Sequence, residues 1–206
     1  MTRKRPYQLK RRAERQDETR RRIAEATMEL HEEVGPAQTT ISAVAERAGV
    51  ERLTVYRHFP TERELLRACQ QHFLARYPYP DPATWAAIAD PRERLRVALC
   101  VLYARYRTTE AMTANLLRDA PSMPALAELL QGMPVYVRAV RDLLAAPWGV
   151  LCERRALLEA VIGHTLDFET WRSLARRQGL TDEQAVDLMV RLVVGVAEDR
   201  GIQASG

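Results

Sequence analysis

The sequence predicts an all-α protein, and three observations support this prediction. Apolar residues recur at the three- and four-residue spacing of helices, and no stretch alternates apolar with polar residues as a half-buried strand would. Several of the nine glycines stand where these helical patterns stop. The composition of the 206 residues, 47% apolar and 28% charged, is that of a globular protein with enough apolar residues for a core.

A small N-terminal module and a larger helical domain are predicted on either side of a proline-rich segment. The sequence YPYPDP, at 77–82, has three prolines in six residues and cannot continue a helix. We therefore expect a basic arm at residues 1–16, a module at residues 17–77 and a helical domain at residues 83–206.

Four helices are expected in the module: two over about 17–33 and 41–48, a third within 49–60, and a fourth that opens at Thr61 and runs through Leu74. Thr40 is placed to cap the second helix, and Gly49 makes the turn that follows it. Thr61 and Glu64 have the spacing of a capping box, which opens the fourth helix.

The larger domain is expected to be helical throughout. Asp90 caps a helix that begins with Pro91, and further helical patterns cover about 125–145, 153–177 and 182–199. Gly132 and Pro134 are expected to kink or divide the first of these three segments.

The positive charge is concentrated at one end of the chain. The formal net charge is +4, and the first 22 residues carry ten Lys or Arg against three Asp or Glu. A basic arm of this kind is typical of proteins that approach a polyanion, although a solvated tail has the same composition.

A short helix in the module, GVERLTVYRHFP at 49–60, presents polar side chains to water. Two short helices joined by a glycine turn form a helix-turn-helix, whose second helix enters the DNA major groove. We expect Arg52 to pair with guanine, and Leu53 and the Thr54 methyl to contact a thymine methyl. Leu53 as a core residue remains an alternative.

Three further residues of this motif are candidates for phosphate contacts, which fix the register on DNA without reading its sequence. Tyr56 and His58 lie further along the second helix, and Thr40 stands at the start of the preceding one. Tyr56 and His58 as ordinary surface residues remain the alternative.

The stretch TTISAVAERAGVERLTVYRHFPTERELL, at 39–66, resembles the DNA-binding domain of the TetR family of transcriptional regulators, and the resemblance extends over about 60 residues, from Asp17 to Tyr77. The resemblance implies a homodimer on a near-palindromic operator, with a C-terminal domain that holds a small-molecule effector and a four-helix dimer interface. Most members are repressors released by ligand. Many members have serine at Glu51 and a phosphate-binding lysine at Glu62, so Arg63 or the basic arm is expected to replace that lysine.

The predicted effector is lipophilic, because several amphipathic or soft side chains of the larger domain are suited to an apolar pocket with a few polar groups. His164, Phe168 and Trp171 fall on one helical stripe of the segment 153–177. Core packing is the alternative for each candidate. The candidate effector-binding residues are Tyr103, Met112, Asn115, Tyr136, His164, Phe168 and Trp171.

The last helical segment is apolar on more than half of its circumference and needs more cover than one neighbour supplies. We expect it to form the homodimer interface together with the preceding helix. A central helix in a monomer, or an adaptor that binds a different protein partner, would have the same pattern.

Other classes of protein are disfavoured. There is no nucleophile elbow, no Gly-rich phosphate loop and no metal-binding spacing, so neither an enzyme nor a bound cofactor or metal is expected. No apolar run approaches the length of a membrane span or follows the basic N-terminus as a signal peptide would. Cys69, Cys100 and Cys152 are expected to be buried thiols of a cytoplasmic protein.

Overall fold

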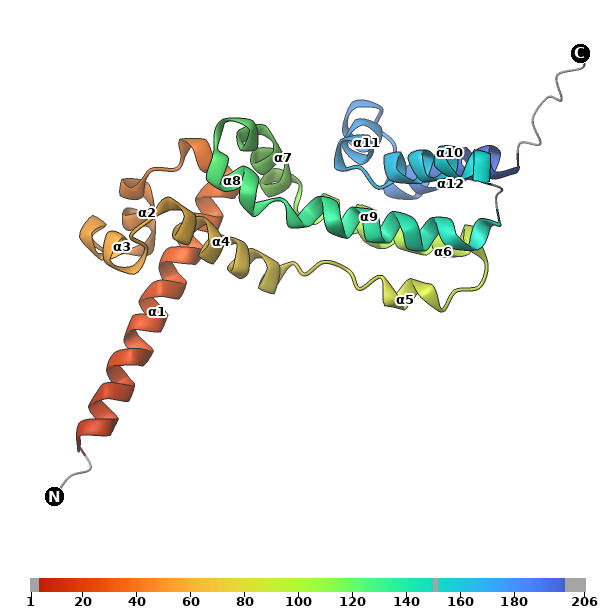
Figure 1. The fold of residues 1–206 in the computed structure, drawn as a ribbon. Coiled ribbons are helices and arrows are strands. Elements are labelled where there is room, and N and C mark those ends of the chain that lie inside the picture. Colours follow the sequence, from red (N-terminus) through yellow and green to blue (C-terminus); the bar gives the residue numbers. More distant parts are fainter. Residues whose placement is uncertain (1–3, 150–151, 199–206) are drawn as a thin grey trace, which may run out of the picture. The chain divides into compact units, whose positions relative to one another are not determined.

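The computed structural model describes residues 4–149 and 152–198, and all elements in this part of the chain are helical (Figure 1). The predicted all-α class is thereby confirmed. The described residues form two compact units. The first unit contains residues 4–78 and 109–131, and the second contains residues 79–108, 132–149 and 152–198.

The first unit is built from six α-helices with two short 3-10 turns. Its central helix is α1, which packs against α2, α4 and α7, while α8 packs against α4. The elements are α1 (Lys4–Glu33), η1 (Pro36–Gln38), α2 (Ile41–Ala48), α3 (Arg52–His58), α4 (Glu62–Arg76), α7 (Glu110–Asp119), η2 (Ala120–Ser122) and α8 (Pro124–Leu129).

The second unit is built around α12, which packs against α6 and α10, and α10 also packs against α9. Its core includes Leu95 and Leu99 of α6, Leu158 and Ile162 of α10, and Val193 of α12. The elements are α5 (Ala83–Ala86), α6 (Pro91–Thr108), α9 (Gly132–Ala145), η3 (Ala146–Trp148), α10 (Cys152–Thr165), α11 (Phe168–Arg172), the π-helical η4 (Ser173–Arg177) and α12 (Asp182–Glu198).

The capping residues predicted from the sequence define the ends of α2 and the start of α4. The Thr40 side chain accepts a hydrogen bond from the Ala43 N–H at 3.1 Å, and Gly49 ends α2 with φ = 63°. A side chain at this φ would be strained, so glycine is required. Thr61 and Glu64 form the predicted capping box at the start of α4.

The first helix begins earlier than predicted, at Lys4 instead of Asp17. Residues 4–16 are rich in Arg, Lys and Gln, which have high helix propensity, and no glycine interrupts them. The segment expected to be a separate basic arm therefore continues α1.

The segment 153–177 is not one helix, as predicted, but α10, α11 and η4. Asp167 marks the break between α10 and α11. Its carboxylate accepts hydrogen bonds from the N–H groups of Glu169 and Thr170 at 2.7 and 3.3 Å and so caps the start of α11. The shared stripe predicted for His164, Phe168 and Trp171 is thereby wrong.

Residues 109–131 lie with the N-terminal unit, although the sequence placed them with the rest of 83–206. Helix α7 was not predicted as a separate helix. It begins after Thr109, which is buried at the end of the α6 pattern.

The cysteines differ from one another in exposure. Cys69 is buried as predicted, but Cys100 is exposed on α6, which contradicts the expectation of a buried thiol. The side chain of Cys152 lies outside the described residues. Within the described ranges, no helix has both the length and the apolar character that crossing a membrane requires.

Candidate DNA-binding surface

Helices α2 and α3 form the predicted helix-turn-helix, packed against α1. Val55 and Phe59 point inward and are 0% and 2% exposed, and they share a core with Ile23 and Val44. This inward anchoring fixes the rotation of α3 about its axis and so decides which of its residues face water.

The residues predicted to read bases lie on the outward part of α3. Arg52 is exposed and Thr54 is partly exposed at the start of the helix. Leu53 is 74% exposed, the largest value among the exposed large apolar side chains of the described residues. The core alternative for Leu53 is therefore excluded, and an isolated apolar group is available for contact with a partner.

The predicted phosphate-contacting residues also reach the surface. The Tyr56 side chain is 46% exposed. Thr40 is exposed at the start of α2, where its hydroxyl oxygen accepts from the Ala43 N–H and its own proton is left to donate. His58 is partly buried, and burial, aided by the charges of Arg57 and Arg20, lowers its pKa.

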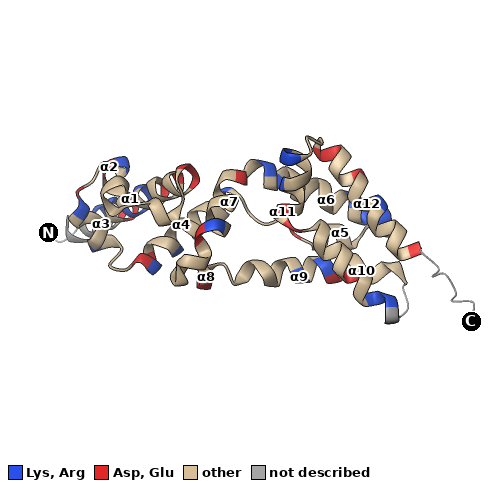
Figure 2. Cartoon of the chain, turned by 90° about the horizontal axis from the view of Figure 1, so that it is seen from above, with Lys and Arg blue, Asp and Glu red and all other residues tan. Residues whose placement is uncertain are grey.

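Two arginines of α1 that were not among the predicted site residues support this motif. Arg20 donates to the His58 carbonyl at 2.7 Å and lies over the Phe59 ring, 4.2 Å from its centroid. Arg22 donates to the carbonyls of Ala48 and Gly49 at the turn. The only sequence signal for these two arginines was the basic excess of the N-terminus. Figure 2 shows Lys and Arg along α1 and α3.

The position of Glu62, where the resemblance suggested a lysine in other members, is exposed. Arg63, one of its two expected replacements, forms an ion pair with Glu128 of α8. In this structure the Arg63 guanidinium therefore joins α4 to α8.

Helix α7 holds the end of α1 and the turn that follows it. The Asn115 amide donates to the backbone carbonyls of His31 and Glu32, both at 2.9 Å. The Arg118 guanidinium donates to the Val34 carbonyl at 3.0 Å, and an Asp119 carboxylate oxygen accepts from the Ala37 N–H at 3.0 Å. These four bonds satisfy backbone groups at a helix end that would otherwise lack partners.

Helix α8 holds α4 in a similar way. The Gln70 amide donates to the Leu129 carbonyl at 3.1 Å, and the Arg63–Glu128 pair lies along the same two helices. Helices α1 and α4, which pack beside the motif, are thus bonded to α7 and α8, a segment more than 30 residues later in the sequence.

Two of the candidate effector residues belong to this support and not to an effector pocket. Met112 is 2% exposed and packs against Met28 and Cys69, and Asn115 bonds to the end of α1. The structure therefore does not bring them together with the other five candidates, which lie in the second unit. The amphipathic pattern correctly predicted that these two side chains are at least partly buried, but it did not predict which residues they contact.

Tyr103, Phe168 and Trp171 do lie together, in an aromatic cluster that also contains Tyr106. The Tyr106 ring is 5.6 Å from that of Phe168 and 6.0 Å from that of Trp171. The polar atoms bond within the unit: Tyr103 Oη donates to the Thr165 carbonyl at 2.9 Å, and Trp171 Nε1 to Asp182 at 3.0 Å.

Tyr136 belongs to a second aromatic group of the same unit. Its ring stacks on Tyr79 at 4.6 Å, and its hydroxyl donates to the Pro80 carbonyl at 2.9 Å. The Arg105 guanidinium lies 4.5 Å from the centroid of the Tyr79 ring, and burial lowers its pKa. His164 is exposed, with Nδ1 3.2 Å from the Thr170 hydroxyl, and is not a core residue.

A pH dependence of stability follows from Asp119. The Arg118 side chain, with the Ala37 N–H, holds the pKa of Asp119 below its ordinary value although burial opposes this. The interaction therefore stabilises the fold above the unfolded-state pKa of about 4 and is lost as the pH falls through the folded-state pKa.

We expect Asp119→Ala to lower the free energy of unfolding by about 1–3 kcal/mol at pH 7, and the difference from wild type to shrink toward pH 3. Urea unfolding at the two pH values measures it. Asp142→Ala is the matched control, because Asp142 also pairs with the preceding arginine but is exposed. An equal loss in both variants at pH 7 would contradict the role assigned to Asp119.

Comparisons with known proteins agree with this geometry. The family model "Bacterial regulatory proteins, tetR family" matches residues 23–69. The repressor KstR of Mycolicibacterium smegmatis is 30% identical over 195 residues, covering 90% of this chain and 92% of that protein, and KstR of Mycobacterium tuberculosis is 30% identical over 192 residues, covering 89% and 84%.

Solved structures share the fold. A TetR-like regulator from Rhodococcus sp. RHA1 has a TM-score of 0.61 at 19% identity, covering 86% of this chain and 94% of that one. NalD, the secondary repressor of the MexAB-OprM multidrug efflux pump in Pseudomonas aeruginosa, has a TM-score of 0.58 at 21% identity, covering 88% and 96%. With the helix-turn-helix geometry and the KstR relatives, these findings establish that the chain belongs to the TetR family of transcriptional regulators.

Proposed function

We propose that this protein is a repressor that binds a near-palindromic operator as a homodimer and is released by a small lipophilic effector. The observation that carries the proposal is the exposed face of α3, where Leu53 and Tyr56 stand in water on a helix whose opposite side is fixed in the core. The repressor role is supported by the KstR relatives.

In the proposed complex, the start of α3 lies in the major groove. Arg52 pairs with a guanine, and the Leu53 side chain and the Thr54 methyl contact thymine methyls. Tyr56 and Thr40 donate to phosphates from the two ends of the motif, and the His58 imidazole is a further candidate for a backbone contact.

The homodimer is proposed to form through α10 and α12. The buried face of α12, which includes Val186 and Val193, is already covered within its own unit. Leucines nevertheless remain on the outside: Leu157 of α10 is 56% exposed, and Leu188 and Leu192, one turn apart on α12, are 44% and 42% exposed. Because α10 and α12 pack against each other, these leucines supply an apolar surface for a second copy.

The effector is proposed to bind in the second unit, where five of the seven candidate residues lie. The two aromatic groups, around Tyr106 and around Tyr136, give this unit a concentration of flat apolar surface suited to a lipophilic or aromatic molecule. Met112 and Asn115 are withdrawn from the proposed effector site because they hold the DNA-binding unit together.

A route from effector to DNA follows from the chain itself. Helices α7 and α8 belong to the first unit, but the chain joins them directly to α6 and α9 of the second. A shift of α6 or α9 would therefore pull on the bonds that join Asn115 to α1, Asp119 to η1 and Leu129 of α8 to Gln70 of α4. An effector that binds more tightly to a conformation in which the two α3 helices no longer match their half-sites would release the operator.

The test is operator binding by Leu53→Ala, with duplex DNA from the gene's own upstream region and a shuffled duplex. Since Leu53 is exposed, we expect an unchanged melting temperature and an operator affinity about 5- to 10-fold lower, with little change on the shuffled duplex. Val135→Ala is the control, because Val135 is 64% exposed on α9, outside the motif. Fluorescence anisotropy at two salt concentrations gives both affinities.

Absence of binding to either duplex at low salt would overturn the proposal. A Leu53→Ala variant that binds like wild type, or one that weakens both duplexes equally, would remove α3 as the element that reads bases. In that second case the motif would contribute phosphate contacts alone.

A further inference from the structure

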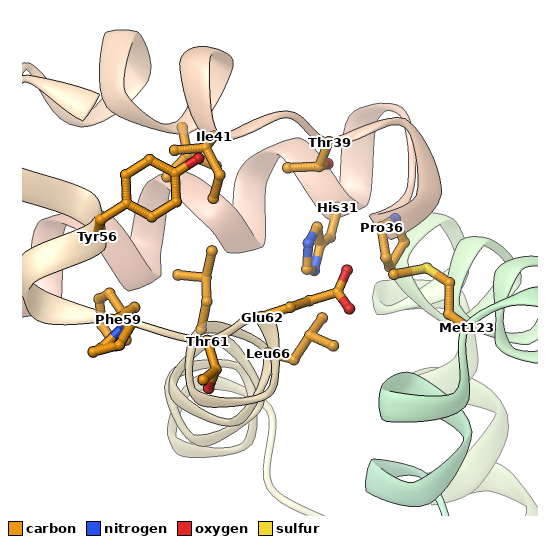
Figure 3. A pocket seen from close by; sticks show the side chains of 13 residues that line it. His31, Pro36, Thr39, Ile41, Tyr56, Phe59, Thr61, Glu62, Leu66 and Met123 are labelled. Carbon is orange, nitrogen blue, oxygen red and sulfur yellow. The ribbon is translucent and has the colours of Figure 1, made fainter. Parts of the chain in front are cut away.

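The first unit contains a cavity of about 200 Å³ beside the DNA-binding motif (Figure 3). It lies between α2, α3 and the start of α4, with His31 of α1 and Met123 at its far side. All of its lining residues belong to the first unit, so the cavity is independent of the proposed effector site in the second.

Two titratable side chains line this cavity, the exposed Glu62 carboxylate and the buried His31 imidazole, and Figure 3 shows both at the same end of it. Among the described residues, the Glu62 carboxylate has neither an ion pair nor a hydrogen bond with another side chain. It is thus a solvent-exposed negative charge at the mouth of the cavity.

His31 is 4% exposed and neutral at pH 7, because burial lowers its pKa to about 4. Its Nδ1 lies 3.4 Å from Cys69 Sγ, and the buried thiol keeps its proton because burial raises its pKa to about 12. With Nδ1 engaged, Nε2 is the ring atom left for an occupant of the cavity. A polar atom at a cavity wall is normally satisfied by a protein group, a water or a ligand.

The remaining walls are largely apolar, with Val44, Phe59, Leu65 and Leu66 among them. An occupant must therefore combine an apolar body with a group that satisfies a carboxylate and an imidazole. An ammonium group has three donors and can serve both, with the tautomer that carries its proton on Nδ1 leaving Nε2 as an acceptor. The volume is below the roughly 300–1,000 Å³ of drug-sized sites, which limits the body to about one ring.

We propose that this cavity is a second ligand site, which binds a small primary amine with a single-ring or comparably short apolar body. The ammonium group pairs with Glu62 and donates to His31, and the apolar body contacts Phe59 and Leu66.

The site is placed to change DNA binding, a consequence that rests on the proposed function. Tyr56 and Ile41 line the same cavity, the first a predicted phosphate contact and the second directly after Thr40. Glu62 repels phosphates, and a bound ammonium group neutralises this charge. The amine is therefore a co-repressor that raises operator affinity, opposite in sense to the effector of the second unit.

The experiment is calorimetric titration of the full-length protein with benzylamine at pH 7, without DNA. Benzyl alcohol, of similar size but uncharged, and benzoate, of opposite charge, are the control ligands. We expect saturable binding of benzylamine alone, weakened about tenfold in Glu62→Gln, since a charge-assisted hydrogen bond is lost. Glu46→Gln, an exposed carboxylate of α2 away from the cavity, is the matched variant and is expected to bind like wild type.

Absence of saturable binding, equal binding of benzyl alcohol, or unchanged binding in Glu62→Gln would each overturn the amine site and leave a cavity that holds only water.

The effect of the amine on DNA binding is tested in a separate measurement. Benzylamine should raise operator affinity two- to fivefold in wild type and not in Glu62→Gln, as expected for neutralising one exposed charge at about 0.5–1 kcal/mol. If benzylamine binds but operator affinity does not change, the co-repressor role is wrong. If no duplex binds at all, the proposed function fails while the amine site stands.

Discussion

Replacing Leu188 by aspartate is expected to convert the proposed homodimer into a monomer and to lower operator affinity by about 100-fold. Leu188 is exposed in one chain, so the aspartate costs little in the fold of the protomer, but in the proposed interface it places a charge in an apolar contact. A dimer places two α3 helices on two half-sites at once, and this avidity typically contributes two to four orders of magnitude in affinity.

The control for this variant is Val135→Asp, which adds the same charge to another exposed apolar position, on α9. Light scattering measures the mass, and anisotropy with the operator duplex measures the affinity. A Leu188→Asp protein that keeps twice the chain mass would contradict an interface at α12. A wild-type monomer would instead favour the adaptor, whose last helices bind a different protein.

Replacing Trp171 by alanine is expected to lower the free energy of unfolding by about 3–5 kcal/mol, the range for a large buried aromatic side chain. Trp171 is 0% exposed, and its ring lies 5.7 Å from Phe168 and 6.0 Å from Tyr106. Its indole N–H bonds to Asp182, which also pairs with Arg107. Removing the ring would therefore leave a cavity and remove one of the hydrogen bonds that the Asp182 carboxylate accepts at the start of α12.

Urea unfolding measures this loss, and Trp171→Phe separates its two parts. Phenylalanine keeps most of the apolar contact but lacks the N–H, so we expect a smaller loss, about 1–2 kcal/mol. The comparison also decides the role of this candidate effector residue. If Trp171→Ala unfolds within about 1 kcal/mol of wild type, the ring is not core support and its assignment as an effector contact gains weight.

The N-terminal module was predictable because short-range interactions define its helices. The caps at Thr40 and Thr61 and the left-handed turn at Gly49 depend on residues at most four positions apart, which a sequence displays directly. The inward positions of Val55 and Phe59 follow from the same local spacing. Once these two were fixed, the outward positions on α3 followed from helix geometry.

The candidate effector residues were less predictable, because an apolar pattern indicates that a side chain is buried but not against what. Met112 has the pattern of a pocket residue but packs on Met28 of α1, more than 80 positions earlier. His164 was expected on one helical stripe with Phe168 and Trp171, but Asp167 caps a new helix after it, and His164 is exposed. Tyr106, whose ring contacts those of Tyr103, Phe168 and Trp171, was not among the candidates.

The sequence by itself determined the helical class, the position of the helix-turn-helix and the residues on the outer side of α3, since each depends on hydrogen bonds and spacing within one or two turns of helix. Only the tertiary structure decided that α7 and α8 support the DNA-binding unit, that Arg63 pairs with Glu128, and that Glu62 and His31 share a cavity. These features depend on which helices pack together, and that choice is made by the fit of side chains that are distant in the chain.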